Sequence, residues 1–379
     1  MVITIKIASV ICEFNPFHNG HKFLIEKIKE NYADIVVCIM SGNFTQRGDI
    51  SIVDKYEKTL TALSNGADLV VELPCAFANS GASIFSDRGV QIAKVLNSDF
   101  LCFGTENFSI DDINFYKNAI RDEEIKNKVK EKIKNGLYYP KALEESLYEC
   151  KNINTEKIKL PNNILALEYS ISCEKYNITP ISINRIGASH DSDITSECFA
   201  SSSYIRKLIK HKEDYSYYSP TKISNPVFIE DIENIIVYKL KSMTKSDLKN
   251  LAEVNEGLEN RIYEFARKYS TLNEILENVK TKRYIMSKLR RISINALLGI
   301  TKEIQNSSNK YIRVLGMNNK GMSLLNNVSL PLITNVKSSS DSLTPNAKNI
   351  FNIDTFSSEV YSVAKKETIN DYNMGIIKI

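Results

Sequence analysis

The fold is decided by the segment from Ile3 to Leu24, which reads ITIKIASVICEFNPFHNGHKFL. Residues 3–12 alternate between polar and apolar side chains and then become apolar, which is typical of a buried β-strand. The loop EFNPFHNG follows, and apolar residues recur at helical spacing from His21 onward. The segment therefore predicts a strand, a loop and a helix, in that order.

Short apolar strands continue to alternate with helices as far as about residue 210, which predicts a parallel α/β sheet. Ligands of such sheets bind beyond the carboxyl ends of the strands, where the connecting loops lie. We therefore expect the loops 13–20, 41–49 and 104–107 to converge on one edge of the sheet. The further strands are expected at 34–40, 67–74, 100–104 and 180–185, and the helices at 21–30, 56–63, 87–96, 164–175 and 201–209.

The rest of the chain divides by composition. Residues 110–150 are charged and helical, which indicates an insertion between sheet elements. The stretch KEDYSYYSPTKISNP at 212–226 is polar and aromatic with two prolines, as in a linker. Amphipathic helices follow to about residue 306, with strand-like pieces at 311–315 and 331–336. We expect a first domain over 1–212, a linker over 213–230 and a mainly helical domain with a few strands over 231–379.

Bulk composition indicates a globular protein of 379 residues, 43% of them hydrophobic and 25% charged. The net charge of +4 permits a local basic patch without proving a nucleic-acid partner. Seven cysteines without a CxxC pair indicate reduced thiols rather than a zinc site, and no other metal-ligand set is predicted. The N-terminus lacks the features of a signal peptide, and the longest apolar run is too short to span a bilayer. We expect a cytoplasmic protein that does not contact membranes, and no feature indicates a protein partner.

The sequence His18-Asn19-Gly20-His21 lies where the first strand passes into a helix. A helix N-terminus offers free N–H groups and a positive dipole end, both of which favour a bound phosphate. Gly20 lets the backbone approach a ligand closely, and two histidines three residues apart can point the same way. They are candidates to donate hydrogen bonds to phosphate oxygens in a transition state. The alternatives are two solvent-exposed loop histidines, or a metal site that lacks a nearby carboxylate.

A second polar stretch, Ala200-Ser-Ser-Ser-Tyr-Ile-Arg206, begins another predicted helix and follows Arg185 at the end of a strand. Ser202 or Ser203 is expected to cap the helix and to hold the β- and γ-phosphates of a nucleotide, with Arg206 nearby. The alternative is a serine cap without a ligand.

A third stretch, KTKRYIMSKLRR at 280–291, contains six basic residues and no acid. On a helix its cations would cover one side and apolar residues the other, and Tyr284 could stack on a base. The alternative is the solvated face of an amphipathic helix. The predicted RNA-binding residues are Lys280, Lys282, Arg283, Lys288, Arg290 and Arg291.

Several blocks together resemble one family. ICEFNPFHNGH, SGNFTQRG, ADLVVELP, FGTEN, LPNNILALEY and INRIGASHDS are similar, in order, to the bacterial tRNA(Met) cytidine acetate ligases, within the HIGH-type (HxGH) nucleotidyltransferase superfamily. They span most of residues 7–206, and ASSSYIR replaces the commoner ISSTxIR. Residues 253–300 resemble the family more loosely.

The resemblance implies a Rossmann-like nucleotidyltransferase domain and an ATP-dependent reaction. Acetate would attack the α-phosphate of ATP, with Mg²⁺ expected beside the nucleotide. The acetyl group would then pass to N4 of the wobble cytidine, C34, of elongator tRNA(Met). A small-molecule adenylyltransferase of the same superfamily and a non-catalytic RNA-binding protein are the competing readings.

The resemblance also assigns roles to residues. His18 and His21 would stabilise charge, since a carboxylate nucleophile needs no base. Glu13 and Asn15 are candidates to shape the acetate pocket, and Gly104 would border the adenosine. The nucleotide-binding residues so implied are Ile11, Cys12, Glu13, Phe14, Asn15, Pro16, Phe17, Asn19, Gly20, Lys22, Phe23, Leu24, Gly104, Asn162 or Asn163, Arg185 and Ile186, together with Ser202 and Ser203.

Overall fold

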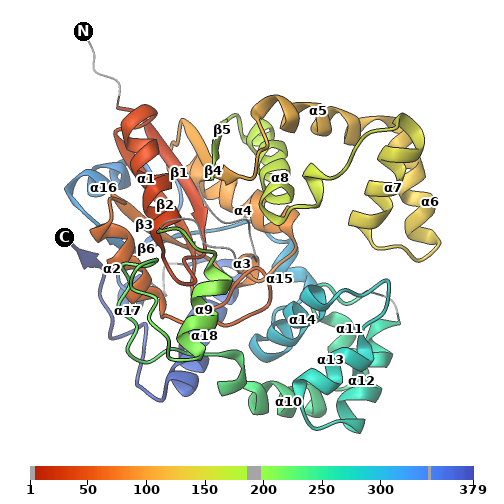
Figure 1. The fold of residues 1–379 in the computed structure, drawn as a ribbon. Coiled ribbons are helices and arrows are strands. Elements are labelled where there is room, and N and C mark those ends of the chain that lie inside the picture. Colours follow the sequence, from red (N-terminus) through yellow and green to blue (C-terminus); the bar gives the residue numbers. More distant parts are fainter. Residues whose placement is uncertain (1–4, 186–197, 256, 340–342) are drawn as a thin grey trace.

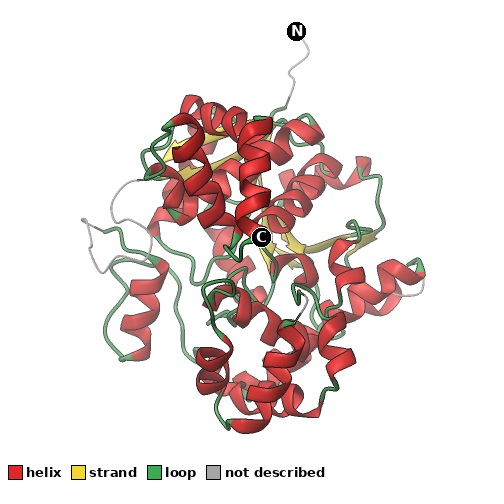
Figure 2. Ribbon diagram, turned by 90° about the vertical axis from the view of Figure 1, so that its right-hand side faces the viewer, coloured by secondary structure: helices red, strands yellow, loops and turns green. Residues whose placement is uncertain are grey.

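A single mixed sheet with helices on both faces organises the protein (Figures 1 and 2). The computed structural model describes residues 5–185, 198–255, 257–339 and 343–379. Along the sheet the strand order is β5-β4-β1-β2-β3-β6-β7, and β8 pairs with β6.

The first five strands are parallel, as the sequence predicts. Helices cover both faces of the sheet, so β1 to β4 are apolar and almost entirely buried, which explains why they read as continuous apolar runs. The α/β fold class is confirmed. The strands are β1 (Ile7–Cys12), β2 (Ile35–Ser41), β3 (Leu69–Leu73), β4 (Phe100–Thr105) and β5 (Thr179–Asn184).

Helices connect these strands, and the predicted charged insertion forms a projecting helical group beyond β4 (Figure 1). The connecting helices are α1 (Asn19–Asn31), α2 (Lys55–Ser64), α3 (Cys75–Ala78), α4 (Ala82–Val95) and α8 (Pro161–Tyr176). The insertion comprises α5 (Ile110–Arg121), α6 (Glu123–Lys134) and α7 (Tyr139–Lys151), followed by the short helix η1 (Lys157–Lys159).

After β5 the chain forms α9, a long connection and a helical group that Figure 1 draws below α8 and α4. The elements are α9 (Ser202–Lys210), η2 (Ile229–Asp231), α10 (Glu233–Ser242), α11 (Lys245–Asn250), α12 (Leu258–Lys268), α13 (Leu272–Val279), α14 (Met286–Leu298) and α15 (Lys302–Asn306). The mainly helical character predicted for this region is confirmed.

The C-terminal segment returns to the first sheet. The strand β6 (Ile312–Met317) pairs antiparallel with β3, with Val71 opposite Val314. The predicted boundary at residue 231 therefore does not follow the sheet, because strands expected in the second domain cover the otherwise open edge of β3. The remaining elements are α16 (Asn319–Leu324), η3 (Leu325–Asn327), β7 (Leu332–Ile333), α17 (Val336–Ser339), α18 (Pro345–Lys365) and β8 (Ile377–Lys378).

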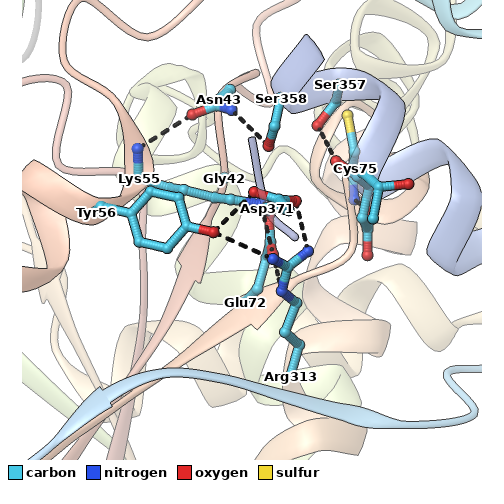
Figure 3. A network of polar contacts seen from close by, with 12 residues as sticks. Gly42, Asn43, Lys55, Tyr56, Glu72, Cys75, Arg313, Ser357, Ser358 and Asp371 are labelled. Atoms are coloured by element: carbon cyan, nitrogen blue, oxygen red, sulfur yellow. Dashed lines mark hydrogen bonds and ion pairs between the residues drawn. The ribbon is translucent and has the colours of Figure 1, made fainter. Parts of the chain in front are cut away.

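A buried ionic network fastens this C-terminal segment to α2 (Figure 3). The Lys55 Nζ lies 2.9 Å from Glu72 Oε1 and 2.9 Å from Asp371 Oδ2. Asp371 also accepts from Arg313 Nη1 at 2.8 Å and from the Tyr56 hydroxyl at 2.8 Å. Burial alone would raise the pKa of Asp371, but the Lys55 and Arg313 charges hold it well below its usual value. The C-terminal segment thereby fixes α2, the helix that follows the loop after β2.

All seven cysteines are free thiols, as predicted, and five of them are buried. Among the described residues, no helix combines the length and the apolar character needed to cross a bilayer.

Candidate active site

A cavity of about 460 Å³ opens at the carboxyl ends of β1, β2, β4 and β5, where the predicted loops converge. The N-terminus of α9 and the first turns of α14 complete its wall. Most of the residues predicted to bind nucleotide line it, together with both histidines. These lining residues are Ile11, Cys12, Glu13, Phe14, Asn15, His18, Gly20, His21, Phe23, Leu24, Gly104, Asn162, Arg185, Ser202 and Ser203.

Six predicted residues are not among those lining the cavity. Lys22 is exposed and lies 3.9 Å from Glu26, on the surface of α1. Ile186 lies outside the described residues. The others are Pro16, Phe17 and Asn163, which are buried, and Asn19, which is half-buried.

Asn163 holds the loop that follows β4. Its Oδ1 accepts from the Glu106 amide at 2.9 Å, and its Nδ2 donates to the carbonyls of Glu106 at 3.0 Å and Lys157 at 2.9 Å. The neighbouring Asn162 donates to the Glu106 carboxylate at 2.6 Å and also lines the cavity. Of the two asparagines that the sequence left open, only Asn162 therefore reaches the cavity.

The predicted linker packs against the HxGH loop. The Asn19 amide donates to the Tyr218 carbonyl at 3.0 Å. The hydroxyls of Ser219 and Thr221 donate to the Phe17 carbonyl at 2.6 and 3.2 Å. Because the two hydroxyl contacts are buried, the linker fixes the backbone that carries the two histidines.

The rings of His18 and His21 stack at the N-terminus of α1. Their centroids are 3.8 Å apart with an interplanar angle of 26°. Phe14 and Phe17 pack against His21 with centroid distances of 4.9 and 5.6 Å. This packing fixes the direction of both imidazoles, as catalytic positioning requires.

The two histidines also cap their own helix. The Gly20 amide donates to His18 Nδ1 at 3.1 Å, and the His18 amide donates to His21 Nδ1 at 3.2 Å. Because Nδ1 is the acceptor in both bonds, the proton of each neutral ring is carried by Nε2. Each ring thus presents an N–H donor at Nε2. A Cβ at residue 20 would lie 2.9 Å from His18 Cε1, which explains the glycine.

The N-terminus of α9 forms the opposite wall, with one correction to the prediction. The cap is Ser201, whose Oγ accepts from the Tyr204 amide at 3.0 Å, and not Ser202 or Ser203. The next two serines are therefore in the first turn and line the cavity. Arg206 joins the two walls, since it donates to the Asn15 carbonyl at 2.8 Å and to the Ser203 hydroxyl at 3.1 Å.

Positive charge exceeds negative charge along the cavity, which suits a polyphosphate ligand. Burial lowers the pKa of Arg185, and the carboxylate of Glu106 opposes that shift. The lining arginines are Arg47, Arg185, Arg206 and Arg291, and the lining carboxylates are Glu13 and Asp49.

Glu13 is half-buried directly after β1, and its Oε1 accepts from the Gln46 amide at 2.6 Å. Burial raises the pKa of Glu13, while that hydrogen bond and the Lys58 charge oppose the shift. Lys58 itself donates to the carbonyls of Glu13 at 2.9 Å, Ser41 at 2.8 Å and Gly42 at 2.6 Å. Burial lowers the pKa of this lysine to about 8. Lys58 thus ties the ends of β1 and β2 together beneath the site.

Sequence reasoning missed part of the lining. The loop after β2 is predicted to reach this edge only as a segment, and four of its residues line the cavity, namely Thr45, Gln46, Arg47 and Asp49. Their position directly after a parallel strand was the available signal. The apolar wall contributed by Phe85, Phe103 and Tyr169 carries no motif that would have marked it.

The basic stretch is only partly helical, contrary to the prediction. The helix α13 ends at Val279 and α14 begins at Met286, so residues 280–285 form a turn. The Thr281 hydroxyl oxygen accepts from the Arg283 and Tyr284 amides, at 3.2 Å each, which favours the turn over a helix. Four of the cations are exposed and Lys288 is half-buried. The exposed ones are Lys280, Lys282, Arg283 and Arg290.

Two members of the stretch are buried. Tyr284 is only 6% exposed, which leaves its ring little surface on which a base could stack. Arg291 forms a two-pronged ion pair with Glu253, with N–O distances of 2.6 and 2.7 Å. Its Nη1 also donates to the Gln46 carbonyl at 3.4 Å. The charge of Arg291 is therefore engaged inside the protein.

Known proteins resemble this chain along most of its length. Residues 5–374 match the family model described as HIGH Nucleotidyl Transferase. The tRNA(Met) cytidine acetate ligase of Thermoanaerobacter pseudethanolicus is 38% identical over 96% of each chain. That of Clostridium acetobutylicum is 34% identical over 98% of this chain and 99% of the relative.

Two solved structures also resemble this chain over almost its whole length. The crystal structure of Thermotoga maritima TmcAL bound with alpha-thio ATP has a TM-score of 0.88 and 27% identity, covering 99% of both chains. Its apo form has a TM-score of 0.89 and 26% identity, covering 99% of this chain and all of that one. The histidine pair, the fold and these likenesses together show that the chain belongs to the tRNA(Met) cytidine acetate ligase family of HIGH nucleotidyl transferases.

Proposed function

We propose that the protein activates acetate with ATP and transfers the acetyl group to N4 of the wobble cytidine, C34, of elongator tRNA(Met). The observation that carries the proposal is the stacked pair of His18 and His21, held at one helix N-terminus and facing a cavity whose other wall is the N-terminus of α9. Two helix N-termini and the three lining arginines Arg47, Arg185 and Arg206 favour a triphosphate between them. The family's ligases support the acceptor and the reaction.

In the first step a carboxylate oxygen of acetate attacks the α-phosphorus, and the bond to pyrophosphate breaks. The Nε2–H groups of His18 and His21 donate to phosphoryl oxygens as their charge grows in the transition state. The first turn of α9 and Arg206 hold the departing pyrophosphate. Acetate needs no base at this step because it is already an anion.

In the second step the acyl group passes to the cytidine amine and AMP leaves. The tRNA would bind along the exposed cations of the basic stretch. Two other residues of that stretch, Ser287 and Arg291, line the cavity, so a tRNA bound there would lie beside the site of acyl transfer. Arg291 itself acts inside the protein and not on phosphates.

Mg²⁺ would arrive with the triphosphate of ATP. Within the described ranges no group of three His, Cys, Asp or Glu residues suits a metal ion. We further propose that the enzyme works in the cytoplasm, where its tRNA substrate is found.

Exchange of labelled pyrophosphate into ATP tests the activation step. We expect exchange that depends on acetate and that falls with longer carboxylic acids. Incubation with tRNA(Met) transcript and nucleoside mass spectrometry should then reveal N4-acetylcytidine. Exchange that ignores acetate but responds to another small molecule would favour a small-molecule adenylyltransferase. Absence of any exchange would favour a non-catalytic RNA-binding protein.

A further inference from the structure

The transfer step needs a proton acceptor that the activation step does not. The lone pair of an exocyclic cytosine amine is delocalised into the ring, so the nitrogen becomes an effective nucleophile only as it loses a proton. Neither histidine is placed to accept it, because Nδ1 of each ring already accepts a backbone N–H and Nε2 carries the proton. The carboxylates that line the cavity, Glu13 and Asp49, are therefore the candidates.

Asp49 sits on a turn of the loop after β2 that is closed by hydrogen bonds. The Thr45 amide donates to the Asp49 carbonyl at 2.9 Å, and the Gly48 amide donates to the Thr45 carbonyl at 3.0 Å. A bridge between Phe44 and Ile50 closes the turn. The carboxylate uses Oδ1 to accept from the Ile50 amide at 2.9 Å. The closed turn thus holds the backbone of Asp49 beside the cavity that this residue lines.

The same turn rests on α14, the helix that contains the second half of the basic stretch. A Cβ at Gly48 would lie 2.3 Å from the amide nitrogen of Arg291 and 2.5 Å from the carbonyl carbon of Arg290. The charges of Arg206 and Arg290 both act on Asp49, whereas Arg290 is not among the cations that act on Glu13. Asp49 is therefore the lining carboxylate nearer to the proposed path of the RNA.

We propose, resting on the function proposed above, that Asp49 is the general base of acyl transfer. Its carboxylate accepts one N4 proton as the amine nitrogen attacks the acyl carbon. The new C–N bond forms, the bond from the acyl carbon to the phosphate oxygen breaks, and AMP departs with that electron pair. The neutral aspartic acid then releases the proton to water.

The electrostatic surroundings suit this role. Burial raises the pKa of Asp49, while Arg206 of α9 and Arg290 of α14 oppose the shift and Glu230 of η2 adds to it. A base with a raised pKa accepts a proton more readily near neutral pH.

Asp49→Asn tests the proposal, with Asp111→Asn, which changes an exposed carboxylate of α5, as the matched control. Two rates are measured on each purified protein: acetate-dependent ATP–pyrophosphate exchange, and single-turnover acetyl transfer to tRNA(Met) from acetyl-adenylate formed on the enzyme. In Asp49→Asn we expect transfer to fall about 100-fold or more relative to exchange. Asp49→Glu should recover part of the loss. In Asp111→Asn both rates should stay near those of the wild type.

The pH profile supplies a second readout that a structural role would not move. Transfer by the wild type should decline on the acidic side as Asp49 becomes protonated, and the residual transfer of Asp49→Asn should lack that decline. The proposal is overturned if Asp49→Asn lowers exchange and transfer equally, or if Glu13→Gln shows the selective loss instead. Failure of the wild type itself to exchange or transfer would instead refute the function proposed above.

Discussion

The α-carbon of Gly48 lies directly against the backbone of Arg291, so the turn beside the cavity and the first turns of α14 are packed without room for a side chain. Gly48 also has a φ of +73°, in the left-handed region that favours glycine. This contact makes the wall of the cavity and the neighbourhood of the basic stretch one packed unit.

Gly48→Ala should therefore destabilise the protein in two ways. We expect a loss of about 2–5 kcal/mol in the free energy of unfolding, from the backbone conformation and from overpacking. Gly136→Ala is the control, since Gly136 has a φ of +95° but a Cβ at that residue would meet no other atom within 4 Å. That change should cost about 1–2 kcal/mol. Urea denaturation measures both, and equal losses would contradict the close contact.

His21→Asn separates the two roles of that histidine. The asparagine Oδ1 can replace Nδ1 as acceptor of the His18 amide, but the donor at Nε2 is lost. We expect the maximal rate of exchange to fall by about 10²–10³ while thermal stability and tRNA affinity change little. Compared with His21→Asn, His21→Gln should cap the helix less well but keep more of the exchange activity. Exchange at the wild-type rate in His21→Asn would show that the imidazole has no part in charge stabilisation.

The exposed cations of the basic stretch should bind phosphates. Lys282→Ala combined with Arg283→Ala is expected to weaken tRNA binding and to reduce the slope of log K against log salt by about two units. Exchange should persist, because neither residue lines the cavity. Lys130→Ala combined with Lys134→Ala on α6 removes the same charge from another surface as a control. Equal effects of the two pairs on tRNA affinity would indicate unspecific attraction by net charge.

Asp354 predicts a pH dependence of stability. Burial and the nearby Glu72 charge raise its pKa to about 7, although the Tyr311 hydroxyl and the Cys75 amide donate to it. The unfolded value is about 3.9, so the folded state binds the proton more tightly between these limits. The stability contributed by the protonated form is fully present below about pH 4 and is lost as the pH rises through about 7.

Asp354→Asn removes this titration with little change in shape. The free energy of unfolding of the wild type, measured relative to the variant in urea, should fall as the pH is raised from about 4 to 8. A difference that stays constant or grows over this range would contradict the raised pKa.

Much of this fold can be predicted from the sequence, because buried parallel strands produce continuous apolar runs and the HxGH residues follow the first of these runs. The pairing of β6 with β3 cannot be predicted in this way, since a short apolar strand does not specify which sheet edge it covers. The break in the basic stretch depends on a turn closed by Thr281, which periodicity does not register.

The candidate site likewise contains residues that the sequence predicts and residues that it does not. The histidines, Gly20 and the start of α9 belong to recognisable motifs. Asp49 lies in a loop that contains no such motif, so the sequence does not distinguish it from other charged loop residues. Arg291 is the clearest example of what three dimensions add, because its ion pair with Glu253 joins residues 38 positions apart. Its neighbours in sequence are exposed cations, which a linear pattern groups with it.

Central to the proposed mechanism is a triphosphate that spans the N-termini of α1 and α9, with the histidine pair beside the bond that breaks. A crystal structure of this protein with a non-hydrolysable ATP analogue tests this placement most directly. We expect phosphate oxygens within hydrogen-bond distance of Nε2 of His18 or His21 and of the first-turn amides of α9. A nucleotide bound elsewhere, or imidazoles turned away from the phosphates, would contradict it.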